Sequence, residues 1–209
     1  MDDTAALLVE LAKSLFARGY SVGSAGNISA RVAGGYLITP TNSCLGRLDP
    51  DRIARLDDNF AHVAGDAPSK EVFMHRAMYR ANAATGAVVH LHSTMATAVA
   101  CLADVDPADA IPPLTPYFVM RIGRALPVVP YYRPGDAAME PAILSTARSG
   151  ARAMLLANHG PLVAAASLTD AVYAAEELEE AAKLYLALRA LPTRLLTAPQ
   201  IADLVAKFG

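Results

Sequence analysis

Two histidines, His90 and His92, are separated by a single residue in the stretch "GAVVHLHSTMA" (residues 86–96). The apolar residues before them are typical of a buried strand, and alternate side chains of a strand project from the same face. Two imidazoles on one face could hold a metal ion together with a third ligand, for which His159 in "MLLANHG" is the candidate. The alternative is that these are core histidines whose ring nitrogens have hydrogen-bond partners.

Glu71 is the best candidate for a general acid or base, because it stands at a predicted helix start shortly before the histidine strand. A carboxylate beside a metal ion and a developing carbanion could transfer a proton. The alternative is a surface glutamate that stabilises the N-terminus of its helix. Tyr117 in "LTPYFVM" could donate a proton from its phenol group, or it could be a packed aromatic residue. The glutamates between residues 176 and 180 are predicted to form a solvated helix face.

Three polar segments could together bind a phosphate group. They are "GSAGNIS" (residues 23–29), "TPTNS" (39–43) and "PSKE" (68–71). They offer hydroxyl groups, amides and backbone N–H groups, which can form an anion-binding nest. Taken one at a time, each segment is an ordinary turn. His62, in a loop, and His75, on a helix, are predicted to be structural.

Helices and strands along the whole chain must position these residues, and their pattern predicts an α/β fold. Helices are predicted over residues 5–16 with an end at Gly19, within 65–82 with Ser69 as the N-cap, over 93–103, and over 167–190 with a cap near Thr169 and Asp170. A helical turn is predicted within 48–57, a hairpin around Gly34 and Gly35, a strand over 86–92, and two strands within 151–167 that meet at a turn of Asn158, His159 and Gly160. The proline-rich stretch 111–136 is predicted to consist of loops and short strands.

The composition predicts one globular domain over residues 1–209, since 54% of the chain is hydrophobic, 18% is charged and the formal net charge is -2. Lys and Arg are scattered, and no window approaches the ~18 consecutive apolar residues of a membrane helix. Neither nucleic acid nor a membrane is therefore an expected partner. The acidic, amphipathic start does not have the pattern of a signal peptide. Cys44 and Cys101 have neither metal-binding nor disulfide spacing, so the cytoplasm is the expected compartment.

The ordered set "GNISAR", "LITPT", "SKEVFMH", "VVHLHS", "ANHG" and "AVYAAEELEEAAKLYL" resembles the class II aldolase/adducin family over most of the chain. The resemblance implies three layers, with a central mixed, largely antiparallel sheet between helices. It also implies that His90, His92 and His159 bind one zinc ion per chain. Glu71 is then the catalytic acid or base and can also reach the metal. The family further implies a homotetramer with the site near a subunit interface.

The same resemblance implies a phosphate site formed by Asn27, Thr41 and Ser69, with backbone groups from Asn42. Asn42 replaces a glycine of the fuculose-phosphate aldolase pattern, and Lys70 stands where that aldolase has a second phosphate-binding serine. Both differences affect the expected phosphate geometry. Tyr117 falls where the aldolase has its proton-donating tyrosine.

Within the family, the segments "TPTNSCLGRLDPDRIARLD", "GDAPSKEVFMHRAMYR", "PPLTPYFVMRIG" and "VPYYRPGD" are most similar to 3-oxo-tetronate 4-phosphate decarboxylases. The implied substrate is a small phosphorylated sugar acid, and the implied products are dihydroxyacetone phosphate and carbon dioxide. Loss of carbon dioxide from a 3-oxo acid leaves an enediolate, whose negative charge zinc would stabilise. The alternatives are an aldolase or epimerase acting on a fuculose- or ribulose-type phosphate, and an adducin-like module without catalysis.

Overall fold

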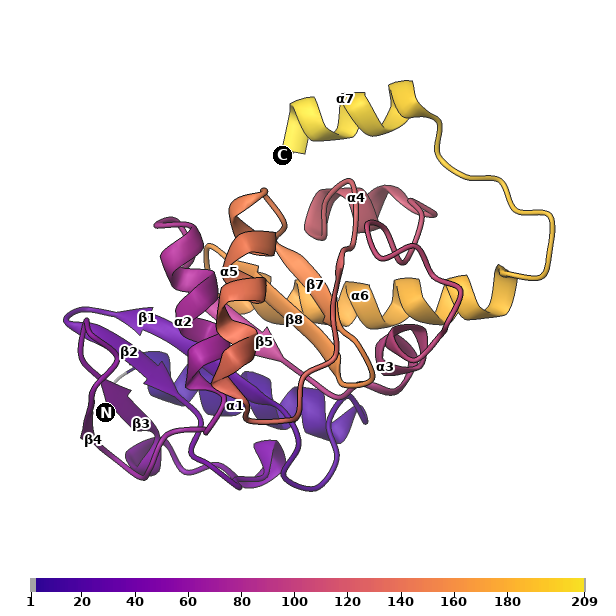
Figure 1. Ribbon diagram of the computed structural model, residues 1–209. Helices are drawn as coiled ribbons and strands as arrows, with labels where there is room; N and C mark the ends of the chain where they lie inside the picture. The colour runs from indigo at the N-terminus through magenta and orange to yellow at the C-terminus, as the bar shows by residue number, and fades with distance from the viewer. Residues whose placement is uncertain (1–2, 209) are drawn as a thin grey trace.

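The computed structural model describes residues 3–208, which build one eight-stranded sheet with the strand order β4-β3-β2-β1-β5-β8-β7-β6 (Figure 1). The strands are β1 (Asn27–Val32), β2 (Gly35–Ile38), β3 (Ala54–Leu56), β4 (His62–Ala64), β5 (Ala87–His90), β6 (Val128–Val129), β7 (Ala153–Leu156) and β8 (Gly160–Ala165). All neighbouring strands are antiparallel except β6 and β7, which are parallel. The expected mixed, largely antiparallel sheet is therefore confirmed.

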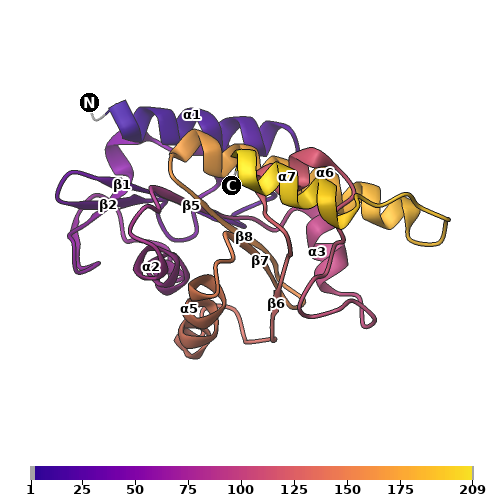
Figure 2. The ribbon, with the colours of Figure 1, turned by 90° about the horizontal axis from the view of Figure 1, so that it is seen from above.

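Helices cover both faces of this sheet. They are α1 (Asp3–Ala17), α2 (Val72–Ala81), α3 (Thr94–Ala100), α4 (Pro116–Arg121), α5 (Glu140–Arg148), α6 (Leu168–Leu188) and α7 (Ala198–Phe208), with short 3-10 turns η1 (Leu45–Arg47), η2 (Pro50–Arg52) and η3 (Ala137–Met139). Figure 2 shows α2 and α5 on one side of the sheet and α1 and α6 on the other. Helix α3 joins the core on the side of α1 and α6, so the fold has the three expected layers.

The alternation of side chains along the central strands decides which residues face α2. In β5, Val88 packs into the core beneath α2 and α5, whereas Val89 packs into the opposite core. His90 follows Val88 by two residues and so projects toward α2. In β1, Ile28 lies in the core beneath α1, which turns its neighbours Asn27 and Ser29 toward α2 as well. Both faces are apolar because both are covered by helices.

Most elements predicted from the sequence are present. The hairpin turns between Val32 and Gly35, and the turn after β7 contains Asn158 in the left-handed region at φ 56°. The strand predicted over residues 86–92 is shorter in the structure, where β5 comprises only the four residues Ala87–His90 and His92 lies beyond its end. Helix α6 is capped by the Ser167 hydroxyl, which accepts from the Asp170 N–H, and not by Thr169.

The structure adds elements that the patterns did not predict. They are the short strands β3 and β4, the helix α4 inside the proline-rich stretch, and the helices α5 and α7. Helix α2 begins at Val72 with Glu71 as its N-cap, so the prediction of Ser69 as the cap is wrong by two residues. The Ser69 hydroxyl instead accepts from the Glu71 N–H just before the helix. None of the helices in the described part of the chain is long and apolar enough to cross a membrane.

Candidate metal centre

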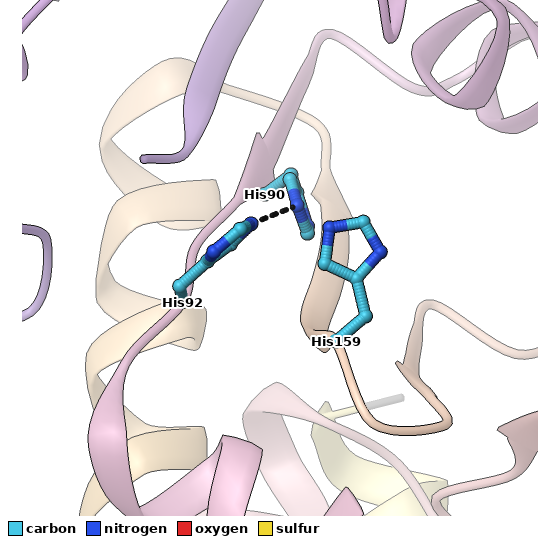
Figure 3. A group of neighbouring side chains, drawn as sticks. All are labelled: His90, His92 and His159. Carbon is cyan, nitrogen blue, oxygen red and sulfur yellow. Dashed lines mark hydrogen bonds between the residues drawn. The ribbon is translucent and has the colours of Figure 1, made fainter. Parts of the chain in front are cut away.

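Three histidines from distant parts of the chain meet at one end of the central strands (Figure 3). His90 ends β5, His92 follows two residues later, and His159 lies in the turn between β7 and β8. Their potential ligand atoms all lie within 4.8 Å of one another, and the Nε2 atoms of His90 and His92 are 3.1 Å apart. The rings meet edge to face, with interplanar angles of 68° to 81°. The predicted triad is therefore one compact cluster of imidazole nitrogens.

Strand pairing explains why the turn of His159 reaches the end of β5. Strand β5 pairs with β8 in antiparallel register, with His90 opposite Leu162, so the turn that precedes β8 lies beside residues 90–92. The approach is close, since a Cβ atom at Gly160 would be only 2.3 Å from the Leu91 carbonyl oxygen. Only glycine fits there, and this explains the sequence "NHG" at the turn.

The hydrogen bonds of the ring nitrogens match those of metal ligands. The Nδ1–H of His90 donates to the Pro161 carbonyl oxygen at 2.9 Å, which leaves the lone pair of Nε2 directed toward the other two rings. Both ring nitrogens of His159 are buried and, among residues 3–208, have no hydrogen-bond partner. Buried polar groups normally have partners, so His159 does not fit the alternative of a satisfied core histidine. A metal ion would satisfy its nitrogen.

Burial keeps the three imidazoles neutral. It lowers the pKa of His90 well below its usual range, and neighbouring His159 and His92 lower it further. Burial, together with His159, lowers the pKa of His92 to about 4. Burial also lowers the pKa of His159, although the Glu71 carboxylate acts in the opposite direction. Neutral imidazole is the form that binds a metal ion, so at neutral pH the cluster is ready to do so.

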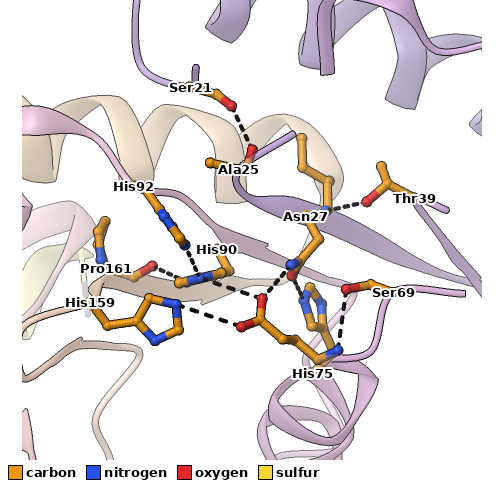
Figure 4. Close-up of polar contacts among 12 residues, drawn as sticks. Ser21, Ala25, Asn27, Thr39, Ser69, His75, His90, His92, His159 and Pro161 are labelled. Atoms are coloured by element: carbon orange, nitrogen blue, oxygen red, sulfur yellow. Dashed lines mark hydrogen bonds and ion pairs between the residues drawn. The ribbon is translucent and has the colours of Figure 1, made fainter. Parts of the chain in front are cut away.

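The Glu71 carboxylate faces this cluster. Its Oε1 lies 3.6 Å from Nε2 of His159, and its Oε2 lies 3.7 Å from Nε2 of His90. The Glu71 side chain is only 15% exposed, which does not fit the alternative of a surface glutamate at a helix start. Oε2 accepts a hydrogen bond of 2.8 Å from the side-chain amide of Asn27 on β1. The side-chain oxygen Oδ1 of Asn27 is in turn hydrogen-bonded to Nε2 of His75 (Figure 4).

A hollow of about 470 Å³ opens beside the carboxylate. Its lining brings together all five predicted phosphate-site residues, namely Asn27, Thr41, Asn42, Ser69 and Lys70, with Glu71 and His92. Two backbone hydrogen bonds hold the loops side by side: Thr41 N–H donates to Ala67 O at 2.9 Å, and Ser69 N–H donates to Thr39 O at 3.2 Å. The three polar segments therefore form one surface, although the phosphate roles of its residues stay a prediction.

Tyr117 is placed differently. Its side chain lies on α4 and is 63% exposed, and it is not among the residues that line the hollow in the described chain. Its role as a proton donor stays a prediction. Pro134 and Gly135 also line the hollow, although the sequence patterns gave no site role to these two loop residues.

The prediction that the glutamates of the long helix are solvated is wrong for Glu179. It was assigned to a solvated face of the long helix, but its side chain is buried and caps α3. Its two carboxylate oxygens accept the N–H groups of Met95 and Ala96, each at 2.8 Å. The apolar spacing could have revealed this, because Ala171 and Ala175 precede Glu179 at intervals of four residues on the buried helix face. The carboxylate thus holds the helix start that follows His92.

Comparisons with known proteins show which family this chain resembles over most of its length. The model of the class II aldolase and adducin N-terminal domain family matches residues 6–186. The chain is 50% identical over 198 residues to the 3-oxo-tetronate 4-phosphate decarboxylase of Escherichia coli K12, covering 94% of this chain and 92% of that protein. It is 33% identical over 192 residues to the L-fuculose phosphate aldolase of the same strain, covering 91% and 86%.

Solved structures share the fold. YgbL from Klebsiella pneumoniae superposes with a TM-score of 0.92 at 46% identity, covering 97% of both chains. An L-fuculose 1-phosphate aldolase superposes with a TM-score of 0.85 at 29% identity, covering 100% of this chain and 97% of the other. The similarity therefore extends over the whole sheet and the helices that cover it.

Proposed function

Because the chain belongs to the class II aldolase and adducin family, we propose that it is a metal-dependent lyase that converts a 3-oxo-tetronate 4-phosphate into dihydroxyacetone phosphate and carbon dioxide. The observation that carries this proposal is the Glu71 carboxylate facing three neutral imidazoles beside a polar hollow. The choice of substrate is supported by the higher identity to the decarboxylases, 50% against 33% for the aldolase.

His90, His92 and His159 would hold the metal ion, for which we propose zinc, one per chain. Three imidazole nitrogens that leave further positions open are a donor set typical of catalytic zinc. When bound, such an ion supplies a Lewis acid that stabilises negative charge developing on substrate oxygens. Within the described chain, the buried ring nitrogens of His159 have no hydrogen-bond partner, which supports this assignment.

The polar loops would bind and orient the substrate. Thr41, Ser69 and Lys70 line the hollow with hydroxyl groups and an ammonium group, which suit a phosphate. Asn27 has one amide hydrogen left after its bond to Glu71, and it also lines the hollow. A phosphate bound by these loops would hold the reacting carbons of the substrate beside the histidines. The binding energy of the phosphate would in this way serve to orient the substrate.

Glu71 would move the proton. Loss of carbon dioxide from a 3-oxo acid leaves an electron pair on the carbon next to the ketone, and this carbon must be protonated to complete the product. The Glu71 carboxyl group borders both the hollow and the histidines. It is the one carboxyl group among the described residues that line the hollow, so we assign the proton transfer to it. Tyr117 remains the second candidate donor.

The rival function is an aldolase or an epimerase, which the similarity to L-fuculose phosphate aldolase supports. Purified protein should be incubated with 3-oxo-tetronate 4-phosphate and, separately, with fuculose 1-phosphate. We expect carbon dioxide from the first substrate and no aldehyde from the second. Aldehyde release from fuculose 1-phosphate, without decarboxylation of the first substrate, would replace the proposal by the aldolase. Inactivity with both substrates would favour the non-catalytic module. The homotetramer and the cytoplasmic location stay predictions.

A further inference from the structure

A row of polar side chains lies between helix α2 and strand β1, within an otherwise apolar layer. His75 and Tyr79 follow Glu71 at intervals of four residues and share one helix face. Asn27 and Ser29 alternate on β1 and face the same helix. His75 and Ser29 are each 1% exposed and Tyr79 is 4% exposed. Such buried polar groups need mutual hydrogen bonds.

The hydrogen bonds in this row have a defined direction, starting from the carboxylate. A carboxylate only accepts, so the Asn27 amide nitrogen donates to Glu71 Oε2 at 2.8 Å, and Asn27 Oδ1 faces His75. The distance from Oδ1 to His75 Nε2 is 2.5 Å, and an amide oxygen can only accept (Figure 4). His75 must therefore carry its hydrogen on Nε2.

The direction continues beyond His75. Burial lowers the pKa of His75 to about 3, so the ring is neutral and its Nδ1 has no hydrogen. The Ser29 hydroxyl therefore donates to Nδ1, at 2.7 Å. The Ser29 oxygen is left as an acceptor for the Tyr79 hydroxyl, at 2.9 Å. The row from Tyr79 to Glu71 is thus a continuous chain in which every link has one donor and one acceptor.

We propose that His75, supported by Ser29 and Tyr79, is a positioning residue that holds Glu71 between His90 and His159 by fixing the Asn27 amide. If that amide turned over, its oxygen would face the Glu71 carboxylate and its NH₂ group would face the Nε2–H of His75. The first contact is repulsive, and the second could be relieved only if His75, Ser29 and Tyr79 all reversed their hydrogen bonds, so this row of hydrogen bonds favours one orientation of Asn27. This inference rests on the proposed proton-transfer role of Glu71.

The test compares His75→Leu with His75→Gln, in protein loaded with zinc. Leucine cannot take part in the row of hydrogen bonds from Tyr79 to Glu71, whereas the glutamine side chain has both a donor and an acceptor. With 3-oxo-tetronate 4-phosphate we expect His75→Leu to lower kcat about 10-fold or more, because Glu71 is no longer held. Metal content should stay within about twofold, because the three histidines are unchanged. His75→Gln should restore most of kcat, and Met74→Leu, a buried change on the same helix, should leave kcat unchanged.

A double-mutant cycle separates positioning from a merely structural role. In a Glu71→Gln background, His75→Leu should cause no further fall in the residual kcat, because its effect passes through Glu71. An equal fall in both backgrounds, or a fall explained by lost metal, would overturn the inference. Ser29→Ala replaces His75→Leu in the cycle if the leucine variant does not fold. If Glu71→Gln alone left kcat unchanged, the proposed function of Glu71 would fail instead.

Discussion

At the scale of single residues, Glu71 is the side chain on which the proposed chemistry depends. Glu71→Gln keeps the size and can still accept from Asn27, but it cannot deliver or take a proton. We expect turnover of 3-oxo-tetronate 4-phosphate to fall ~100-fold or more, the size typical of a lost general acid or base. Zinc content, measured by elemental analysis, should stay nearly intact. Glu10→Gln on the exposed side of α1 is the matched control, and a Glu71→Gln enzyme as active as this control would contradict the assignment.

The buried His75 should also make the free energy of unfolding depend on pH. Its pKa is about 3 in the folded protein, because of burial, and near 6.5 in the unfolded chain. Between these values the unfolded chain binds more protons, so the free energy of unfolding falls as the pH is lowered through this window. From pH 7.5 to 5 the loss due to His75 should be about 2 kcal/mol. Urea unfolding of the wild type and of His75→Gln at both pH values measures it, and equal losses in the two proteins would disprove the prediction.

At the scale of elements, the Glu179 cap connects helix α6 to the start of α3. The carboxylate accepts two N–H groups at a helix N-terminus, an arrangement that also complements the helix dipole. Glu179→Ala should lower the free energy of unfolding by about 1–2 kcal/mol, the cost of a lost cap. It should also weaken zinc binding in a competition titration, because His92 lies two residues before α3. The exposed neighbour Glu180 gives the control Glu180→Ala, and indistinguishable zinc affinities would refute the connection to His92.

Helices, strands and turns could be predicted from the sequence where neighbouring residues alone determine the backbone conformation. The glycine hairpin and the turn at Asn158 depend on local backbone conformation, and the long helix depends on its own apolar spacing. Strands β3 and β4 were missed because three residues are too few for a period. Helix α4 was not predicted because the surrounding stretch is rich in proline. The one proline inside the helix, Pro116, occupies the first turn, where proline is favoured.

At the scale of the whole molecule, the site exists because segments far apart in sequence are paired. His159 reaches His90 through the pairing of β5 with β8, and Asn27 reaches Glu71 through the packing of α2 on β1. Strand order and helix packing do not follow from local patterns. The residues alone therefore gave His159 only as a candidate partner of the histidine pair, and the three polar loops only as a possible joint phosphate site. The family resemblance assigned roles to these residues. Neither the residue patterns nor the resemblance indicated the contacts made by His75 and Glu179.

The whole fold should also respond to the metal. Three neutral imidazoles meet only in the folded state, so zinc should bind the folded protein and stabilise it. At a free zinc concentration of about 100 times the Kd, the expected gain is about 2.7 kcal/mol. Thermal unfolding with and without zinc measures this gain, and elemental analysis should find about one zinc per chain. His159→Ala should abolish most of the shift; a shift of the same size in that variant would show that zinc binds elsewhere.

The measurement that tests the central claim most directly is carbon dioxide release from 3-oxo-tetronate 4-phosphate by one preparation in three states: zinc-loaded, stripped with a chelator, and reloaded. Carbon dioxide and dihydroxyacetone phosphate should appear in equal amounts in the loaded state, disappear in the stripped state and return on reloading. Undiminished release by stripped protein, or no release by protein that holds one zinc per chain, would contradict a metal-dependent decarboxylase at His90, His92 and His159.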